Sequence, residues 1–85
     1  MEVVFTEAAR KDLEYWKETN NVKVQKRITA LLQSIMETPF TGIGKPEPLR
    51  YDLAGYWSRR ITDEHRLVYS VSENIVTVIA ARFHY

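Results

Sequence analysis

The hydrophobic period of the chain changes after Pro39, and this change restricts the folds that it can adopt. Val24, Ile28, Leu31 and Ile35 follow one another at intervals of 4, 3 and 4 residues, which places them on one face of an α-helix. Pro39 ends this helix because the residue before a proline avoids the α region. The chain beyond it carries short runs rich in β-branched and aromatic residues, a pattern typical of strands.

The first half is predicted to contain a short strand and two helices. Residues 3–5 form an apolar strand, and Thr6 suits a helix N-cap because its hydroxyl can accept from an unpaired backbone N–H. The helix after it should run to about Glu18. Its buried face is predicted to comprise Ala9, Leu13 and Trp16. Turn-forming residues 19–21 then separate this helix from the second one.

The second half is predicted to form four strands, at residues 47–53, 56–62, 66–70 and 75–83. Short turns link them, and such links favour antiparallel neighbours. The expected fold is therefore α+β, in the order β-α-α-β-β-β-β, with two N-terminal helices packed on one face of a twisted, mainly antiparallel sheet. The 85 residues make a single domain, residues 1–85.

Composition excludes several classes of function. The chain has no cysteine, so disulfides and thiol redox chemistry are absent. Its two histidines lie in different segments, without an HExxH pair or a carboxylate cluster, so neither a metal nor another cofactor is expected. No apolar run approaches the roughly 20 residues of a membrane span, and no secretory signal is present, so a cytoplasmic location is expected. The net charge of +1 argues against a highly basic nucleic-acid coat protein.

Four residues supply the groups that a metal-free ribonuclease requires: Glu47, Arg66, His84 and Tyr85. Such an enzyme needs a base for the 2'-hydroxyl proton, cations for the charged phosphorane and an acid for the departing 5'-oxygen. An imidazole, with an ordinary pKa of about 6.5, can serve as acid or base near neutrality. Desolvation between the prolines that flank Glu47 would make its carboxylate a stronger base.

Strand alternation gives the expected direction of the arginines. In the strand at residues 66–70, Arg66 points away from the helices, whereas Leu67 and Tyr69 suit the core. Arg59 and Arg60 point to opposite faces of their strand, so only one of them can join Arg66 directly. The alternation alone does not say which.

Ordinary structural roles compete with these assignments. Glu47 can be a solvated charge on an edge strand, His84 a frayed end, and Arg66 one partner of a surface ion pair. His65 is interpreted as structural. The same cations can also hold RNA phosphates without cleaving them, which would give a binding module with salt-sensitive affinity.

Several motifs occur in a fixed order: YWKET at 15–19, TPF at 38–40, GKPEPL at 44–49, LAGYWSRRIT at 53–62, EHRLVY at 64–69 and FHY at 83–85. Through them the chain resembles the YoeB toxins of bacterial toxin–antitoxin modules, a branch of the RelE superfamily, over nearly its whole length. The resemblance implies a RelE-like fold and an endoribonuclease that enters the ribosomal A site, cuts the mRNA codon there and inhibits translation. It also implies a cognate antitoxin and a homodimer.

The resemblance further implies that Glu47 is the catalytic carboxylate, Arg66 the phosphate-stabilising arginine and His84 the acid–base histidine. Arg60 and Tyr85 match positions that bind or position the RNA. The full set of predicted substrate-binding residues is Arg50, Arg59, Arg60 and Tyr85. The chain departs from residues common in the family at Arg50, Tyr51 and Phe83, which affects substrate contacts rather than the chemistry.

The sequence therefore predicts a metal-independent, ribosome-dependent mRNA endonuclease. Two alternatives stand beside it. A RelE-like fold also occurs in toxins directed at DNA gyrase, which do not need this set of Glu, Arg, His and Tyr. The third interpretation is a non-catalytic module that binds RNA or the ribosome.

Overall fold

A computed structural model describes residues 1–83 of the chain. The elements are β1 (Glu2–Phe5), α1 (Glu7–Glu18), α2 (Val22–Glu37), β2 (Glu47–Pro48), the 3₁₀ turn η1 (Tyr51–Leu53), β3 (Trp57–Arg60), β4 (Arg66–Ser72) and β5 (Ile75–Ala80). This order confirms the predicted succession β-α-α-β-β-β-β.

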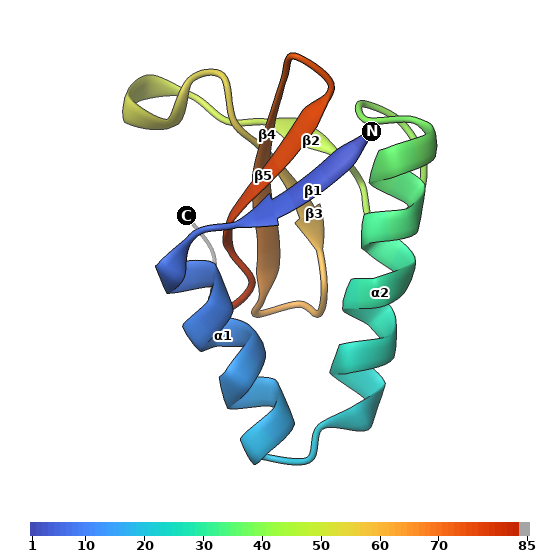
Figure 1. Ribbon diagram of the computed structural model, residues 1–85, viewed down its shortest axis with the longest axis vertical. Helices are drawn as coiled ribbons and strands as arrows, with labels where there is room; N and C mark the ends of the chain where they lie inside the picture. Colours follow the sequence, from blue (N-terminus) through green and yellow to red (C-terminus); the bar gives the residue numbers. More distant parts are fainter. Residues whose placement is uncertain (84–85) are drawn as a thin grey trace.

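The five strands form one sheet in the order β1-β5-β4-β3-β2. β1 runs parallel to β5, and every other neighbouring pair is antiparallel. Helices α1 and α2 lie beside one another, joined by a short turn, and pack against one face of this sheet (Figure 1). The predicted α+β class is confirmed. β2 is an edge strand, which leaves one side of Glu47–Pro48 unpaired.

The helix boundaries follow local sequence signals. Thr6 caps α1, and its Oγ1 accepts from the backbone N–H of Ala9 at 3.2 Å. Asn21 caps α2 in the same way, accepting from Val24 N at 3.1 Å. α2 ends at Glu37, just ahead of Pro39 as predicted.

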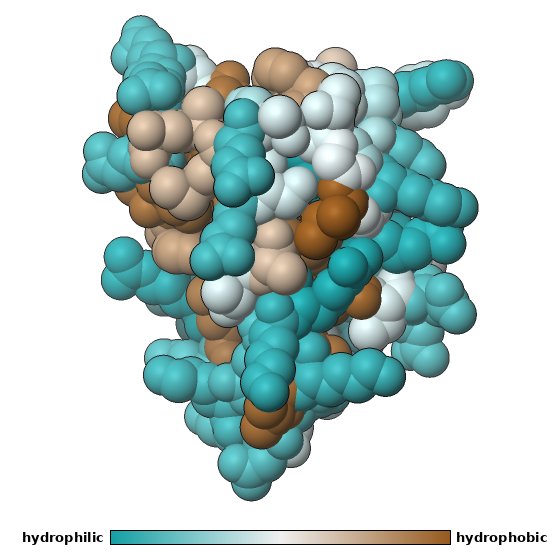
Figure 2. Space-filling model, turned by 90° about the vertical axis from the view of Figure 1, so that its right-hand side faces the viewer, coloured by the Kyte–Doolittle hydropathy of each residue, from teal (hydrophilic) through white to brown (hydrophobic). Residues whose placement is uncertain are grey.

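The predicted buried faces of the two helices form the core. All four members of the α2 stripe are at most 6% exposed, and Ala9 and Trp16 of α1 are buried with them. They pack against side chains of β4 and β5, namely Leu67, Tyr69, Val76 and Val78. The outer surface on the α2 side is mostly hydrophilic, with separate hydrophobic patches (Figure 2). Neither helix in residues 1–83 has the length and apolar character needed to cross a membrane.

Three strand predictions were too long, and the run predicted at 56–62 forms a strand only at Trp57–Arg60. The run at 47–53 contains a strand only at Glu47–Pro48, because proline lacks an N–H and the chain turns at Tyr51, where φ is +60°. The run at 75–83 leaves the sheet after Ala80. There, Ala81 N donates to Asp12 Oδ2 at 3.0 Å and Ala81 O accepts from Trp16 Nε1 at 2.8 Å, so side chains of α1 replace a neighbouring strand.

The guanidinium of Arg59 connects β3 to the end of α2 and to the loop after it. It has no exposed surface. Its Nε donates to Tyr69 Oη, and its two terminal nitrogens donate to Ser34 Oγ and to the carbonyl oxygens of Thr38, Thr41 and Ile43, all at 2.7–3.1 Å. A buried charge is stable only when its donors are satisfied, and here neutral oxygens satisfy them. Arg59 thereby fixes the loop that leads to Glu47.

Close packing around this guanidinium requires glycine in the loop. Gly42 has φ of +113°, and a Cβ added there would collide with Ser34 Oγ and lie 3.2 Å from Arg59 Nη1. Tyr69 completes the cluster, because its hydroxyl accepts from Arg59 and donates to Pro39 O at 2.6 Å. Burial raises the pKa of Tyr69 above its ordinary value of 10.0, although the hydrogen bond and charge of Arg59 partly oppose this.

The raised pKa of Tyr69 predicts a loss of stability in alkali. The folded protein holds the Tyr69 proton more tightly than the unfolded chain, so its contribution is complete below about pH 10 and is lost as the pH rises through the higher folded value. Urea unfolding between about pH 8 and 11 should show this fall, and Tyr69→Phe should make it shallower. Tyr51→Phe is the matched control, since Tyr51 is 90% exposed. Equal slopes for all three proteins would contradict the assignment.

Arg59→Lys should destabilise the protein strongly although it keeps the charge. An ammonium has three donors for the five acceptors around Arg59, and each buried group left unpaired costs about 1–3 kcal/mol. The free energy of unfolding in urea should therefore fall by roughly 2–6 kcal/mol. Arg60→Lys, at the adjacent half-buried position, should cost less than about 1 kcal/mol. A similar loss in both variants would refute the structural role of Arg59.

Candidate functional site

Strand register brings Glu47, Arg60 and Arg66 to one face of the sheet. Glu47 lies opposite Ser58, and Arg60 lies opposite Arg66. Residues paired in this way share a face with their Cβ atoms about 5 Å apart, and the diagonal from Glu47 to Arg60 is about 7 Å. The intervening residues of β3 and β4 point into the helix-packed core. The sheet thus presents a carboxylate and two guanidiniums on the side away from the helices.

The centre of this face consists of short, buried side chains. Val68 lies opposite Ser58 on one neighbouring strand and opposite Ala80 on the other. These three residues are at most 8% exposed, and they lie outside the core cluster that the helices cover. The long charged side chains of Glu47, Arg60 and Arg66 therefore border a central area of short, buried side chains.

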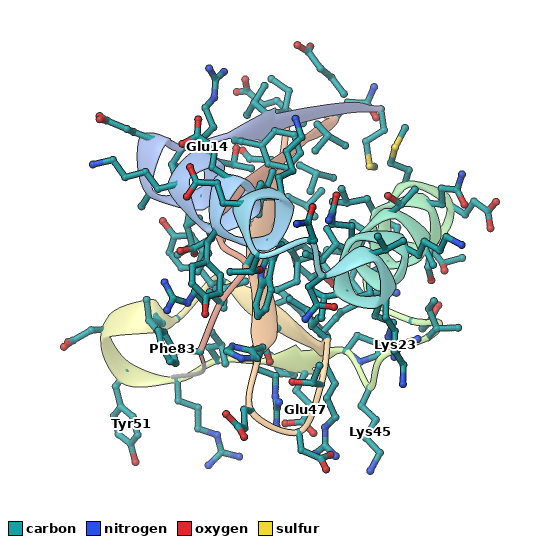
Figure 3. The ribbon with its side chains drawn as sticks, turned by 90° about the horizontal axis from the view of Figure 1, so that it is seen from below. Glu14, Lys23, Lys45, Glu47, Tyr51 and Phe83 are labelled. Carbon is teal, nitrogen blue, oxygen red and sulfur yellow. The ribbon has the colours of Figure 1, made fainter. Side chains whose placement is uncertain are left out.

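Glu47 itself is exposed at the edge of the sheet. Figure 3 shows it on the side of the molecule that faces away from α1, with Lys45 and Tyr51 on the same side. The desolvation expected from the flanking prolines is not found. Within residues 1–83 the one ion pair joins Lys11 to Glu7, at 3.8 Å, so Glu47 carries no bound cation from this part of the chain.

Arg66 stabilises the turn between β3 and β4 and forms no ion pair with any residue of 1–83. Its Nη1 donates to the carbonyl oxygens of Thr62, Asp63 and His65 at 2.8, 3.1 and 3.2 Å. The remaining guanidinium nitrogens, Nε and Nη2, have no hydrogen-bond partner among the described residues. A half-buried guanidinium held at one nitrogen is well placed to bind an anion through the others.

Arg60, not Arg59, is the arginine that lies beside Arg66. Burial removes Arg59 from this face, so its prediction as a substrate-binding residue is wrong: all its donors serve the core. The backbone of Arg60 is held on both sides, since its N–H donates to Gly44 O at 2.7 Å and its carbonyl accepts from Arg27 Nη2 at 3.2 Å. Arg60 also lines an open groove of about 500 Å³ with Lys23 and Arg27.

The remaining predicted site residues are Arg50, which borders the site, and His84 and Tyr85, which lie beyond the described residues 1–83. Arg50 is exposed and immediately precedes the 3₁₀ turn η1. His84 and Tyr85 lie outside the described residues, so their predicted roles are untested.

Side chains of α1 hold the segment that leads to the last two residues, and no local pattern in the sequence predicts this contact. Besides the contacts of Ala81 with Asp12 and Trp16, the guanidinium of Arg82 lies 3.5 Å from the ring centre of Tyr15 and 4.6 Å from that of Phe83. Asp12 and Tyr15 carry no periodic signal for this role. Among residues 1–83 there is no group of three or more side chains suited to a metal ion.

Comparison with known sequences gives a consistent result. The profile described as "YoeB-like toxin of bacterial type II toxin-antitoxin system" matches residues 5–85. "Toxin YoeB" of Synechocystis is 49% identical over 85 residues, covering 100% of this chain and 98% of the relative. "Toxin YoeB" of Escherichia coli is 46% identical over 85 residues and both chains are covered completely.

Solved structures agree with the sequence comparison. A YoeB/ParE toxin from Agrobacterium tumefaciens superposes with a TM-score of 0.96 at 48% identity, with full coverage of both chains. The toxin in a YoeB–YefM complex from Staphylococcus aureus gives 0.90 at 43% identity, and a YoeB dimer from the same organism gives 0.91 at 42%. Each of these covers 100% of this chain and 98% of the other.

Proposed function

The chain belongs to the YoeB family of toxins from bacterial type II toxin–antitoxin systems, and on this basis we propose that it is an endoribonuclease that cleaves mRNA in the ribosomal A site. The observation that carries the proposal is the register that sets Glu47 on the same sheet face as Arg60 and Arg66. A base beside two cations is the arrangement that attack on a phosphodiester requires.

The reaction needs no group beyond the protein and the RNA. Glu47 takes the proton from the 2'-hydroxyl, and the 2'-oxygen attacks phosphorus. The bond from phosphorus to the 5'-oxygen then breaks, and His84 gives its proton to that oxygen. Arg66 and Arg60 stabilise the charge on the phosphorane, and Tyr85 orients the base or the scissile phosphate. The products are a 2',3'-cyclic phosphate and a 5'-hydroxyl.

In this proposal the ribosome excludes water from the exposed site and positions the substrate there. Glu47 lies at an open edge of the sheet, so substrate and rRNA must exclude water and bring the 2'-hydroxyl to the carboxylate. This accounts for a dependence on the A site. Arg50, exposed beyond Glu47, is placed to contact a flanking phosphate.

Membership of this family also leads us to infer that a protein partner regulates the chain. We assign to this chain a cognate antitoxin and a homodimer, because relatives from Staphylococcus aureus occur as a YoeB–YefM complex and as a YoeB dimer. An antitoxin that offers acidic or aromatic residues to the arginine-bearing face would block RNA. A substrate on the ribosome places the active toxin in the cytoplasm.

Primer-extension mapping of an mRNA in a purified translation system tests the nuclease. The wild type should cut within the A-site codon, and the Glu47→Ala, His84→Ala double variant should not. Glu47→Gln alone should slow cleavage by about 10²–10⁴-fold, the usual contribution of a general base. The upstream fragment should end in a 2',3'-cyclic phosphate or a 3'-phosphate.

The outcomes separate the three classes of function. Tight ribosome binding without a cut would favour the non-catalytic module, and inhibition of DNA supercoiling would favour a gyrase-directed toxin. A 3'-hydroxyl at the cut would contradict cyclisation through the 2'-oxygen. Unfolding curves of each variant show whether lost cleavage reflects lost structure.

Arg60 should contribute one phosphate contact to RNA binding. In a Glu47→Gln background, where RNA stays intact, Arg60→Ala should weaken binding of a short single-stranded RNA. It should also reduce the slope of log affinity against log salt by about 0.7. Arg60→Lys keeps the charge and should keep the slope. Unchanged salt dependence in Arg60→Ala would remove this residue from the RNA-binding surface.

A further inference from the structure

The backbone of Phe83 is held on both sides by two consecutive residues, His65 at the end of the β3–β4 connection and Arg66 at the start of β4. Its N–H donates to Nδ1 of His65 at 2.7 Å, and its carbonyl accepts from the backbone N–H of Arg66, also at 2.7 Å. The first bond comes from a side chain and the second from the backbone. Only the first therefore depends on which amino acid stands at position 65.

The His65 ring is fixed in the orientation that this bond requires. It packs edge-on against Trp16, with ring centres 4.8 Å apart and planes at 84°, and it contacts the ring of Phe83 at 5.4 Å. The backbone oxygen of His65 accepts from Ile61 N at 2.9 Å and Thr62 N at 3.2 Å. Because Nδ1 accepts a hydrogen bond, it carries no proton, and a neutral ring is protonated at Nε2. The sequence-based interpretation of His65 as structural is confirmed for its packing.

Phe83 needs this support more than an ordinary strand residue would. It lies beyond β5, so no sheet ladder holds it, and its φ of +59° is a left-handed conformation that non-glycine residues rarely adopt. Such a conformation is strained and persists only where the surroundings enforce it. Phe83 is also 58% exposed, so packing alone does not enforce it.

The same two residues supply both the anchor of Phe83 and a guanidinium of the candidate site. Arg66 binds Phe83 O through its backbone, while its side chain lies on the candidate site. Anything that fixes Phe83 against residues 65 and 66 therefore fixes the point at which the chain passes to its last two residues, His84 and Tyr85.

We propose that His65 is a positioning residue of the cleavage reaction: its Nδ1 sets the backbone of Phe83, and through it the start of the catalytic C-terminal pair, against Arg66. This rests on the proposed nuclease function, because it assigns His65 no contact with RNA. Loss of the acceptor should lower kcat more than it raises KM, since Arg60 and Arg66 still bind the substrate while the acid is misplaced.

Three substitutions distinguish the acceptor from the bulk of the ring. In His65→Asn the side-chain oxygen is two bonds from Cβ, as Nδ1 is, so it can accept from Phe83 N. In His65→Gln the polar atoms lie one bond farther out, where Nε2 was. His65→Ala removes both. All three variants lose the ring contact with Trp16, so they should lose a similar amount of stability. Differences among them in Phe83 exchange and in cleavage then measure the effect of the hydrogen-bond acceptor.

Two measurements on the full chain give the result. Hydrogen exchange of the Phe83 amide, followed by NMR, should be protected in the wild type and in His65→Asn. It should be roughly two- to tenfold faster in His65→Gln and His65→Ala, the range expected for one hydrogen bond of ordinary strength. Single-turnover cleavage on programmed ribosomes should rank the four proteins in the same order, with similar half-saturating concentrations.

Several results would overturn the proposal. Equal Phe83 exchange in all four proteins would show that the bond to Nδ1 does not hold the segment. Faster exchange with unchanged cleavage would show that the bond has no bearing on the reaction, as would equal activity loss in His65→Asn and His65→Gln. A wild type that binds ribosomes without cutting mRNA would instead refute the nuclease, and the exchange rates would still decide the anchor.

Discussion

The buried guanidinium of Arg59 is the interaction on which the arrangement of the site depends. It is a full charge without exposed surface, and neutral oxygens from the end of α2, the loop after it and β4 satisfy it. The loop therefore has little freedom, and Gly42 is required where it passes the guanidinium. Because this loop leads directly into β2, the position of Glu47 follows from a core contact rather than from its own neighbours.

On the exposed face of the sheet, unlike around Arg59, two positive charges lie close together without full compensation. Arg60 and Arg66 stand directly across from one another, an arrangement of like charges that destabilises a sheet. Nearby carboxylates do not neutralise them within the described residues; instead, backbone carbonyls bind part of Arg66. Stability alone does not explain two opposed arginines, and the proposed binding of an RNA phosphate would offset their repulsion. The unfavourable pair thus fits a surface built to receive an anion.

Residues 81–83 are held in a different way from the strands. Residues 81–83 have left the sheet, and their position is set by side chains of α1 and by His65. Arg82 lies over the ring of Tyr15, and the backbone of Phe83 is held at Arg66. A short terminal segment becomes ordered when its backbone groups find such partners. The first helix therefore holds a segment that is about 65 to 70 residues away from it in sequence.

The sequence by itself determined the element order and the buried faces of both helices. These follow from local periodicity, caps and breakers, which act over a few residues. Only the tertiary structure decided that Arg60 rather than Arg59 lies beside Arg66, that β2 is two residues long and that Asp12 and His65 hold the C-terminal segment. Such facts depend on strand register and on contacts between distant residues, and neither leaves a periodic signal along the chain.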